Sequence, residues 1–335
     1  MYLFNTKIIN ILTNIVKHFE DKIMEKLSKI SFFKYVVSLF IVYILFCMIL
    51  SPSFYLQTTL DGISAWALNV LPSLLPFVFF TKLLSSFGLI EKLSSFFAKP
   101  IKKLFNAPAL SAYTFLSSII SGYPVGAKVT ADLYQSGKIS RTDACKMLCF
   151  SSTSGPMFVI GAVGAGMFGN ALAGYIIFSA HVLGAFLNGL LYRKIKLKEF
   201  DTIATKKDEK SFNLSSIVLD TSLSVITVGT IIAIFFVVIS SLSPLLSFLP
   251  SPVSAFCGGL IEITRGCLDI ANAMPLSLGI ISASFIISFG GISTMMQTYA
   301  LTSEIKMPIK LMVLQKLTHA LLSCLISIIL VAIIL

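Results

Sequence analysis

The sequence has 335 residues, of which 56% are hydrophobic and only 12% are charged, and its formal net charge is +11. This composition excludes a soluble domain, which could not cover so much apolar surface, and predicts an all-α polytopic membrane protein. The basic residues lie between apolar runs, as the positive-inside rule predicts, so we expect no nucleic-acid partner. The six cysteines form no CxxC pair and no metal-ligand set, so we expect neither a metal nor a cofactor.

Residues 1–34 predict an amphipathic helix on the cytoplasmic side. Apolar residues recur at helical spacing from Ile8 to Ile30, and lysines lie largely between them. The pattern favours a helix that lies on an anionic membrane surface. Packing of the same helix on the protein itself is the alternative.

Apolar runs of about 20 residues, the length that crosses a bilayer, recur along the chain. The loop at 51–62 has no Lys or Arg and is placed outside, whereas the 193–213 loop is the most charged stretch and is placed in the cytoplasm. Alternation then puts the N-terminus inside and residue 335 outside. We predict about seven spanning helices, at 35–51 (the first transmembrane helix), 63–88, 143–167, 170–192, 215–242, 275–300 and 311–334.

Two further apolar stretches are predicted to enter the membrane and return on the same side. Lysines flank residues 107–135 at both ends, so the Gly-Tyr-Pro-Val-Gly sequence from Gly122 is expected to form the tip of a re-entrant helical hairpin. Residues 252–272 are expected to enter from the outside. Irregular backbone is tolerated at this depth only beside protein or a water-filled cavity.

The chain after its first span is interpreted as two gate-like repeats, 62–192 and 214–335, of inverted topology. Each has a span, a hairpin, a span interrupted by glycine and a final span. The hairpin approaches PALSAYTFLSSIISG and PVSAFCGGLIEITRG both run from Pro to Gly over the same length. Residue identity is low, so chance similarity of two apolar stretches is the alternative. Inverted repeats with broken helices predict alternating-access transport, with helix N-termini that favour an anion near the midplane.

The candidate substrate-binding residues lie at the hairpin tips and the interrupted spans. Arg265 offers a planar fork to a carboxylate, and Lys128 is its counterpart in the first hairpin. A Glu262–Arg265 pair that only holds the hairpin, and a loop lysine that only reaches the interface, are the alternatives. The whole set is Ser121, Gly122, Tyr123, Gly126, Lys128, Ser152, Ser154, Gly155, Glu262, Thr264, Arg265, Gly266, Gly290, Gly291, Ser293 and Gln297.

Several of these residues have a structural alternative as well. The hydroxyls before the Gly155-Pro156 break could bind substrate or cap the broken helix. Ser293 and Gln297 could bind a ring heteroatom or contact another helix. His181 is predicted to be a packed histidine rather than a proton relay.

An enzyme is not expected, because the sequence has no HExxH, GxSxG or Walker A pattern. The alternative to a transporter is a non-transporting membrane scaffold that recruits partners through the 193–210 loop and the N-terminal helix. Oligomeric state and protein partners stay open, and the lipid bilayer is the partner that the composition itself predicts.

Four motifs in order carry a family resemblance: SGYPVGAK (121–128), SGPMFVIGAVGAGMFG (154–169), LIEITRG (260–266) and SFGGISTMMQ (288–297). Over roughly 60–335 the sequence resembles the YlbJ (SpoVV) family of sporulation integral membrane proteins, which belongs with the nucleoside-recognition gate domain proteins. The resemblance implies a protein of the outer forespore membrane that carries dipicolinic acid toward the forespore. It also implies a fold similar to the core of concentrative nucleoside transporters. A nucleoside or other small-anion carrier is the alternative within transport.

Overall fold

The computed structural model describes residues 34–198 and 213–335, and every regular element in these ranges is a helix. The chain divides into two compact units, residues 1–56 and 57–335. In the first unit, the helix Lys34–Leu50 lies where the first transmembrane helix is predicted. The predicted N-terminal amphipathic helix and most of the charged loop lie outside the described residues.

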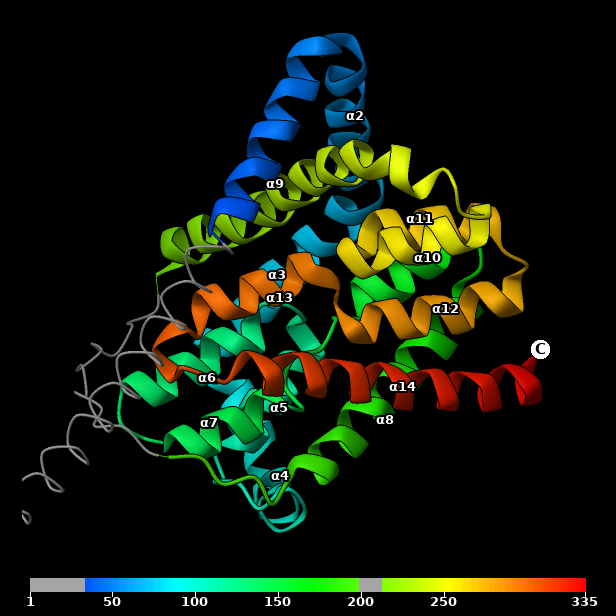
Figure 1. Ribbon diagram of the computed structural model, residues 1–335. Coiled ribbons are helices and arrows are strands. Elements are labelled where there is room, and N and C mark those ends of the chain that lie inside the picture. The colour runs from blue at the N-terminus through cyan, green and yellow to red at the C-terminus, as the bar shows by residue number, and fades with distance from the viewer. Residues whose placement is uncertain (1–33, 199–212) are drawn as a thin grey trace, which may run out of the picture. The chain divides into compact units, whose positions relative to one another are not determined.

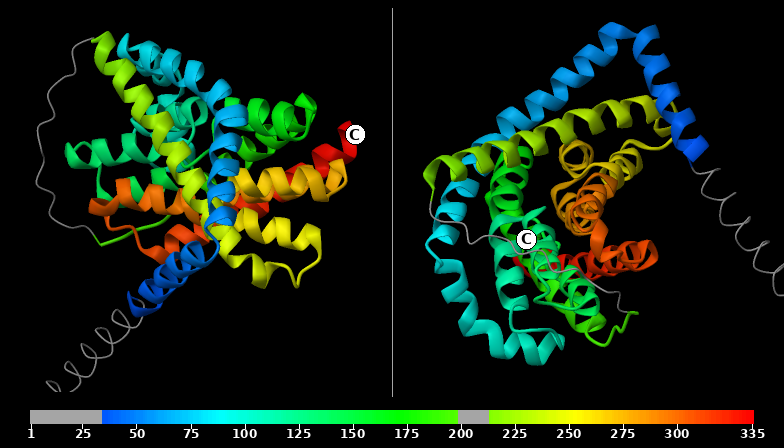
Figure 2. Two further views of the ribbon diagram at one scale, coloured as in Figure 1. Left: turned by 90° about the horizontal axis from the view of Figure 1, so that it is seen from above. Right: turned by 90° about the vertical axis from the view of Figure 1, so that its left-hand side faces the viewer.

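The second unit is built of helices that are mostly short and closely packed (Figure 1). The helix α9 stands out in both views of Figure 2 as one long rod without a break. In chain order the helices are α2 (Pro52–Ala65, which begins in the first unit), η1 (Trp66–Val70), α3 (Leu71–Ser86), α4 (Leu89–Phe105), α5 (Ser111–Ser121), α6 (Val125–Gln135), α7 (Arg141–Leu148), η2 (Met157–Met167), α8 (Ala171–Tyr192), α9 (Leu214–Leu246), α10 (Ser251–Ile261), α11 (Ile263–Ala273), α12 (Leu276–Phe289), α13 (Gly291–Leu301), η3 (Ser303–Ile305) and α14 (Ile309–Ile334).

Four stretches of the described chain are long and apolar enough to cross a membrane: Ala171–Tyr192, Leu214–Ser241, Leu276–Leu301 and Ile309–Ile334. A fifth is obtained if Lys34–Leu50 and Pro52–Val70 are counted as one broken span. The protein is therefore an all-helical, multi-pass membrane protein. The count of seven crossings stays a prediction.

Two of the predicted spans are interrupted more than the sequence suggested. The run predicted at 63–88 is divided among α2, η1 and α3. The run predicted at 143–167 is divided into the short helix α7, an irregular segment and η2. Pro156 explains the second break, because it has no N–H to donate and stands immediately before η2.

Both predicted hairpins are present as pairs of short helices. The turn at Gly122 and Tyr123 separates α5 from α6, and the single residue Glu262 separates α10 from α11. The arms α10 and α11 pack so closely that a Cβ on Gly266 would lie 2.7 Å from the backbone nitrogen of Gly259. Each hairpin is followed by a broken helix and then by a long one. The two repeats and their inverted orientation stay predictions.

Local capping residues fix where several helices begin. The Asn170 side chain accepts hydrogen bonds from the backbone N–H groups of Leu172 (2.9 Å) and Ala173 (3.3 Å) at the start of α8. Asn213 accepts from Ser216 N–H at the start of α9 in the same way. These bonds satisfy N–H groups that have no partner within the helix.

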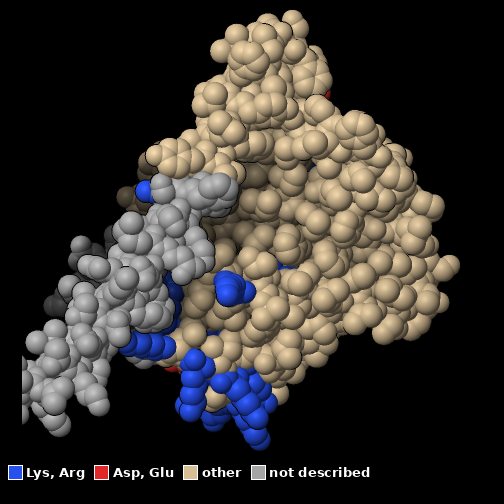
Figure 3. All heavy atoms as spheres, in the orientation of Figure 1, with Lys and Arg blue, Asp and Glu red and all other residues tan. Residues whose placement is uncertain are grey.

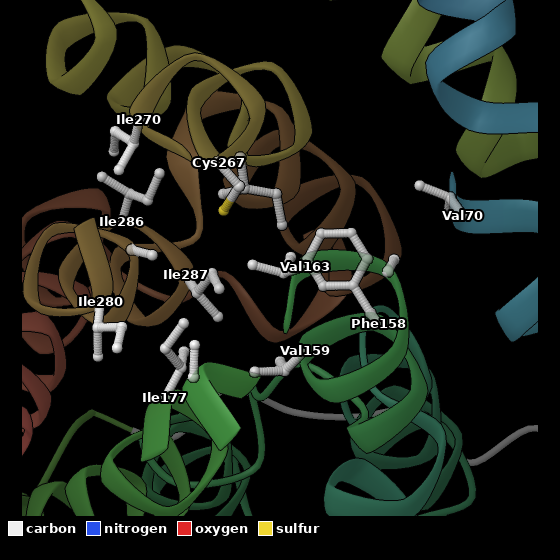
Figure 4. Packing of buried hydrophobic residues seen from close by; sticks show 14 of the residues in the cluster. Val70, Phe158, Val159, Val163, Ile177, Cys267, Ile270, Ile280, Ile286 and Ile287 are labelled. Carbon is white, nitrogen blue, oxygen red and sulfur yellow. The ribbon is translucent and has the colours of Figure 1, made fainter. Parts of the chain in front are cut away.

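The main apolar core lies between η2 and the helices α8, α11 and α12. Figure 4 shows side chains of η2, among them Val159 and Val163, directed toward Ile177 of α8 and Ile287 of α12. Cys267 of α11 belongs to the same cluster and is a free thiol. This core holds η2 against α8, α11 and α12.

Helix α14 shows how the molecule is adapted to lipid. It packs against α8 and α12 (Figure 1). Its exposed face carries Leu314, Leu317, Leu321, Leu325 and Ile328. Its buried face carries Gln315, Lys316, His319, Ser323 and Ser327. Apolar residues outside and polar residues inside are the arrangement expected where the surrounding solvent is hydrocarbon.

Charged side chains are unevenly distributed over the face of the molecule shown in Figure 3. In Figure 3, Lys and Arg side chains gather at one end of the face shown, and most of the remaining surface in view carries no charge. A shallow hollow beside α4 is lined by Lys99, Lys102 and Lys103. Such a separation is what the positive-inside rule predicts for a cytoplasmic end.

Candidate functional site

A small cavity of about 60 Å³ lies where the two hairpin tips meet the two interrupted helices. We call it the central cavity. The helices α3 and α9 complete its wall with apolar side chains. Its lining is Leu74, Ser121, Gly122, Tyr123, Ser154, Gly155, Phe158, Val228, Ile231, Ile232, Glu262, Ile263, Thr264, Ser293, Thr294 and Gln297. Nine of the predicted site residues are therefore brought together at one place: Ser121, Gly122, Tyr123, Ser154, Gly155, Glu262, Thr264, Ser293 and Gln297.

The first hairpin tip touches the first break through backbone atoms. Gly122 has the left-handed φ of +74°, and a Cβ built on it would overlap the backbone of Gly155. The adjoining arm is tied to the same segment by Ser118, whose hydroxyl donates to the Ser151 carbonyl at 2.5 Å and accepts from the N–H of Thr153 at 3.2 Å. Only glycine allows this approach, because any side chain would push the tip and the break apart.

The second hairpin tip meets the second break in the same manner. The break is at Gly290, whose φ of +86° ends α12. A Cβ on the next residue, Gly291, would lie 3.0 Å from the carbonyl oxygen of Ile261 at the end of α10. At the tip itself, the buried Glu262 carboxylate accepts a hydrogen bond from the Arg265 N–H at 2.7 Å and so caps α11.

Two hydroxyl groups that line the central cavity have no protein partner in the described chain. They are the side chains of Ser154, from the first break, and Ser293, from the second, and both residues are buried. Buried polar groups in proteins are nearly always hydrogen-bonded. The two breaks thus bring one unpaired hydroxyl each to the wall of this cavity, where a ligand or water would supply the missing partner.

Helix N-termini add partial positive charge to this region. The helices α6, η2, α11 and α13 each begin within a few residues of a cavity-lining residue. Their first N–H groups have no partner within the helix and favour negative charge. The Glu262 cap already uses this potential at α11. The helices α6, η2 and α13 have no side-chain cap among the described residues.

Arg265 and Gly266 lie outside the central cavity lining. The Arg265 guanidinium binds Asp269 through Nε, at 3.0 Å and 2.8 Å to the two carboxylate oxygens, and lies 5.0 Å from the ring centroid of Phe236. The ion-pair partner of Arg265 is thus Asp269, one turn further along α11, whereas Glu262 interacts only with the Arg265 backbone N–H. Gly266 serves the contact between α10 and α11.

The remaining predicted residues shape the surroundings of the central cavity. Gly126 packs its backbone on the Ser151 carbonyl, and Ser152 offers its own carbonyl to Lys316. Gly290 and Gly291 form the second break.

Lys128 lines a second cavity of about 150 Å³, which we call the lysine cavity. Lys82 lies in the same lining, where its Nζ donates to the Asp220 carbonyl at 2.5 Å and to the Ser224 hydroxyl at 2.9 Å. Lys128 is exposed. The two cavities share Ser121 and Tyr123, so the first hairpin tip stands between them.

The sequence analysis overlooked the polar residues of α14. Lys316 is fully buried, and its Nζ donates to the Tyr123 hydroxyl at 2.6 Å and to the Ser152 carbonyl at 3.0 Å. Lys316 lies within the spanning helix predicted at 311–334. A lysine inside an apolar span is itself a functional signal and could have been found this way.

His181 is buried and hydrogen-bonded, in keeping with the predicted packed histidine. Its Nε2 accepts from the Ser154 N–H at 2.9 Å, so its proton is on Nδ1, which lies 2.7 Å from the Ser288 hydroxyl. It thereby links the first break to α12. In the described part of the chain, no three His, Cys, Asp or Glu side chains are grouped as metal ligands.

Comparison with known proteins gives two similarities. Residues 67–171 match the Gate family model, described as nucleoside recognition. The chain is similar to the sporulation integral membrane protein YlbJ of Bacillus subtilis (strain 168), with 34% identity over 181 residues, which are 54% of this chain and 44% of that protein. The aligned part thus spans less than half the length of this curated relative. No solved structure matches the chain. The chain is thus similar to a sporulation integral membrane protein, and it matches the nucleoside-recognition Gate model over residues 67–171, which are less than half of its length.

Proposed function

We propose that the chain is a membrane transporter of a small planar carboxylate, and that this substrate is dipicolinic acid moved across the outer forespore membrane during sporulation. The observation that carries the proposal is the central cavity, where two hairpin tips and two helix breaks meet around unpaired hydroxyls from both repeats. Broken helices that converge in this way are the usual substrate site of transporters with inverted repeats.

The chemistry of the cavity suits a ring that bears carboxylates. The N-termini of α6, η2 and α13 offer N–H groups to anionic oxygens. The unpaired hydroxyls of Ser154 and Ser293 supply further donors. Apolar side chains of α3 and α9, among them Leu74 and Ile232, cover the faces of a flat ring. The relative's description as a sporulation protein agrees with a spore-forming context.

The size of the cavity adds a requirement. A volume of about 60 Å³ is well below that of typical small-molecule sites, which are roughly 300–1,000 Å³. Transport therefore requires a second state in which a hairpin tip and its break move apart. The lysine cavity shares Ser121 and Tyr123 with the central one and gives an approach from the side of Lys82 and Lys128. In this proposal the two lysines raise the local concentration of an anion before it reaches the tip.

A nucleoside carrier is the second candidate, and Glu262 favours it. This carboxylate and the Gln297 side chain line the central cavity and can accept hydrogen bonds from sugar hydroxyls or base N–H groups. The Gate family description names nucleoside recognition. A dianionic substrate would instead have to bind on the far side of the cavity from this carboxylate, because like charges repel.

Purified protein in proteoliposomes distinguishes the two candidates. We expect uptake of labelled dipicolinate that saturates and that unlabelled dipicolinate, but not uridine, inhibits. Repeating the assay with and without proton and sodium gradients identifies the driving force. Uptake of labelled uridine without uptake of dipicolinate would replace the first candidate with the second. Empty liposomes of the same lipid provide the background.

A further inference from the structure

Lys316 is a buried basic residue without an acidic partner. Its side chain is fully buried in α14, and its Nζ contacts only neutral oxygen atoms, the Tyr123 hydroxyl and the Ser152 carbonyl. No carboxylate in the described part of the chain forms an ion pair with it. Ionisable side chains in membrane interiors are costly, and they are retained where they bind or move something charged. The position of Lys316 therefore calls for an anionic partner from outside the protein.

Tyr123 connects this lysine to both cavities. The Lys316 Nζ lies 4.4 Å from the Tyr123 ring centroid, and the same tyrosine lines the central cavity and the lysine cavity. Because the phenol oxygen accepts from Lys316, the phenol proton must be directed to another acceptor. An ammonium group that holds a tyrosine in this way makes the tyrosine a better donor to an anion.

Lys316 also sits where the separate parts of the site meet. Ser152 belongs to the first break and Tyr123 to the first hairpin tip. A Cβ built on Gly290, in the second break, would lie 3.3 Å from the Tyr123 hydroxyl oxygen and 3.4 Å from the Lys316 Nζ. One ammonium group thus bonds to the first break and to the first tip and lies close to the second break.

A purely structural role for Lys316 is a clear alternative. The carbonyl groups at the end of α12 and in the segment after α7 carry partial negative charge, and an ammonium group between them would neutralise it. In that case, loss of the charge would lower the stability of the protein and would lower its affinity for every ligand to the same extent.

We propose that Lys316 is the positioning residue that makes the central cavity select an anion: it holds Tyr123 so that the phenol proton faces a bound carboxylate, and it supplies the positive charge behind that contact. This inference rests on the proposed function and names the residue that sets substrate class. In this inference, the charge of Lys316 distinguishes a carrier of carboxylates from a carrier of neutral solutes with the same fold.

The test compares two ligands of one shape. Purified protein in detergent is titrated with dipicolinate and with pyridine-2,6-dicarboxamide, its neutral analogue. We expect wild type to prefer dipicolinate, and Lys316→Met to lose about tenfold or more of dipicolinate affinity with little change for the diamide. Lys310→Met is the matched control, because Lys310 is an exposed lysine on the same helix and should leave both affinities unchanged.

Further variants keep the proposal falsifiable if Lys316→Met unfolds. Tyr123→Phe keeps the ring and removes the hydroxyl, and it should reduce the preference for the anion in the same direction. Adding Tyr123→Phe to Lys316→Met should cost little more, because the two side chains act as one unit. An unchanged preference in Lys316→Met, or an equal loss for both ligands together with a lower melting temperature, would overturn the inference and leave the transporter proposal intact. Wild type that binds no dipicolinate would overturn the proposed substrate and this inference together.

Discussion

At the scale of single residues, substitution of Ser154 and Ser293 distinguishes an effect on ligand binding from an effect on protein stability. Both are buried in the central cavity wall and neither has a protein partner in the described chain. A buried hydroxyl without a partner contributes nothing to stability, since its desolvation is not compensated. We propose that a bound ligand supplies the missing partner of each hydroxyl.

We therefore expect Ser154→Ala and Ser293→Ala to keep or slightly raise the melting temperature in detergent. Each should weaken dipicolinate binding by about 0.5–1.5 kcal/mol, or roughly two- to tenfold, because one hydrogen bond to the ligand is lost. Ser118→Ala is the control with the opposite behaviour. Its hydroxyl is bonded to Ser151 and Thr153, so its loss should lower the melting temperature. A drop in melting temperature for the first two variants, with unchanged binding, would contradict this assignment.

Residue types in the sequence indicated the positions of the breaks but not the side-chain partners. Gly122, Gly155 and Gly290 mark the tips and interruptions because no other residue tolerates these backbone conformations or approaches. The partners of Arg265 and Lys316 depend on which helices lie beside them. Asp269 is close enough in sequence to be considered, whereas Tyr123 reaches Lys316 only through the folded structure.

At the scale of elements, the second hairpin depends on contact between two glycines. Gly259 of α10 and Gly266 of α11 face each other with no space for a side chain. Small residues let helices approach closely in membranes, where burial of apolar surface gives no driving force. The hairpin is thus held by close packing and by the Glu262 cap rather than by large side chains.

Gly266→Ala should destabilise the protein by about 1–3 kcal/mol, because the new methyl group overlaps the backbone of α10. The matched control is Gly258→Ala, where the nearest atom to the new Cβ is a methyl carbon of Ile239 at 4.0 Å. That variant should be neutral or stabilising by up to about 1 kcal/mol, since alanine is the better helix former. Thermal unfolding in detergent measures both. Equal effects of the two substitutions would mean that the arms are not packed as described.

At the scale of the whole molecule, hydropathy predicted a multi-pass helical protein but not where each helix ends. The long helices α8, α9 and α14 lie within a few residues of the predicted spans at 170–192, 215–242 and 311–334. The run at 63–88 contains a π-helical turn between α2 and α3, whereas the run at 143–167 is broken before η2, where Pro156 has no N–H to donate. Mean hydropathy therefore locates the apolar segments of the chain but does not show whether the helix in each segment is continuous.

The whole-molecule hypothesis of a scaffold is tested by deleting residues 1–30. A transporter built from the region 57–335 should keep dipicolinate uptake in proteoliposomes after this deletion, at a rate within about twofold of the full chain. A scaffold would instead lose its localisation and sporulation phenotype in cells. Equal amounts of inserted protein, measured by immunoblot, provide the control. Loss of uptake from correctly inserted protein would show that the N-terminal segment is part of the carrier.

The glycine contacts between tips and breaks also bear on how such a molecule moves. Interdigitated side chains hold two packed surfaces in one register, because the side chains must separate before the surfaces can shift. Where Gly122 meets Gly155, and where Gly291 meets Ile261, the touching surfaces are main chain without intervening side chains. A shift of the first tip along its break would therefore have to break the Ser118 hydrogen bonds to Ser151 and Thr153, but it would meet no side chain at the glycines themselves.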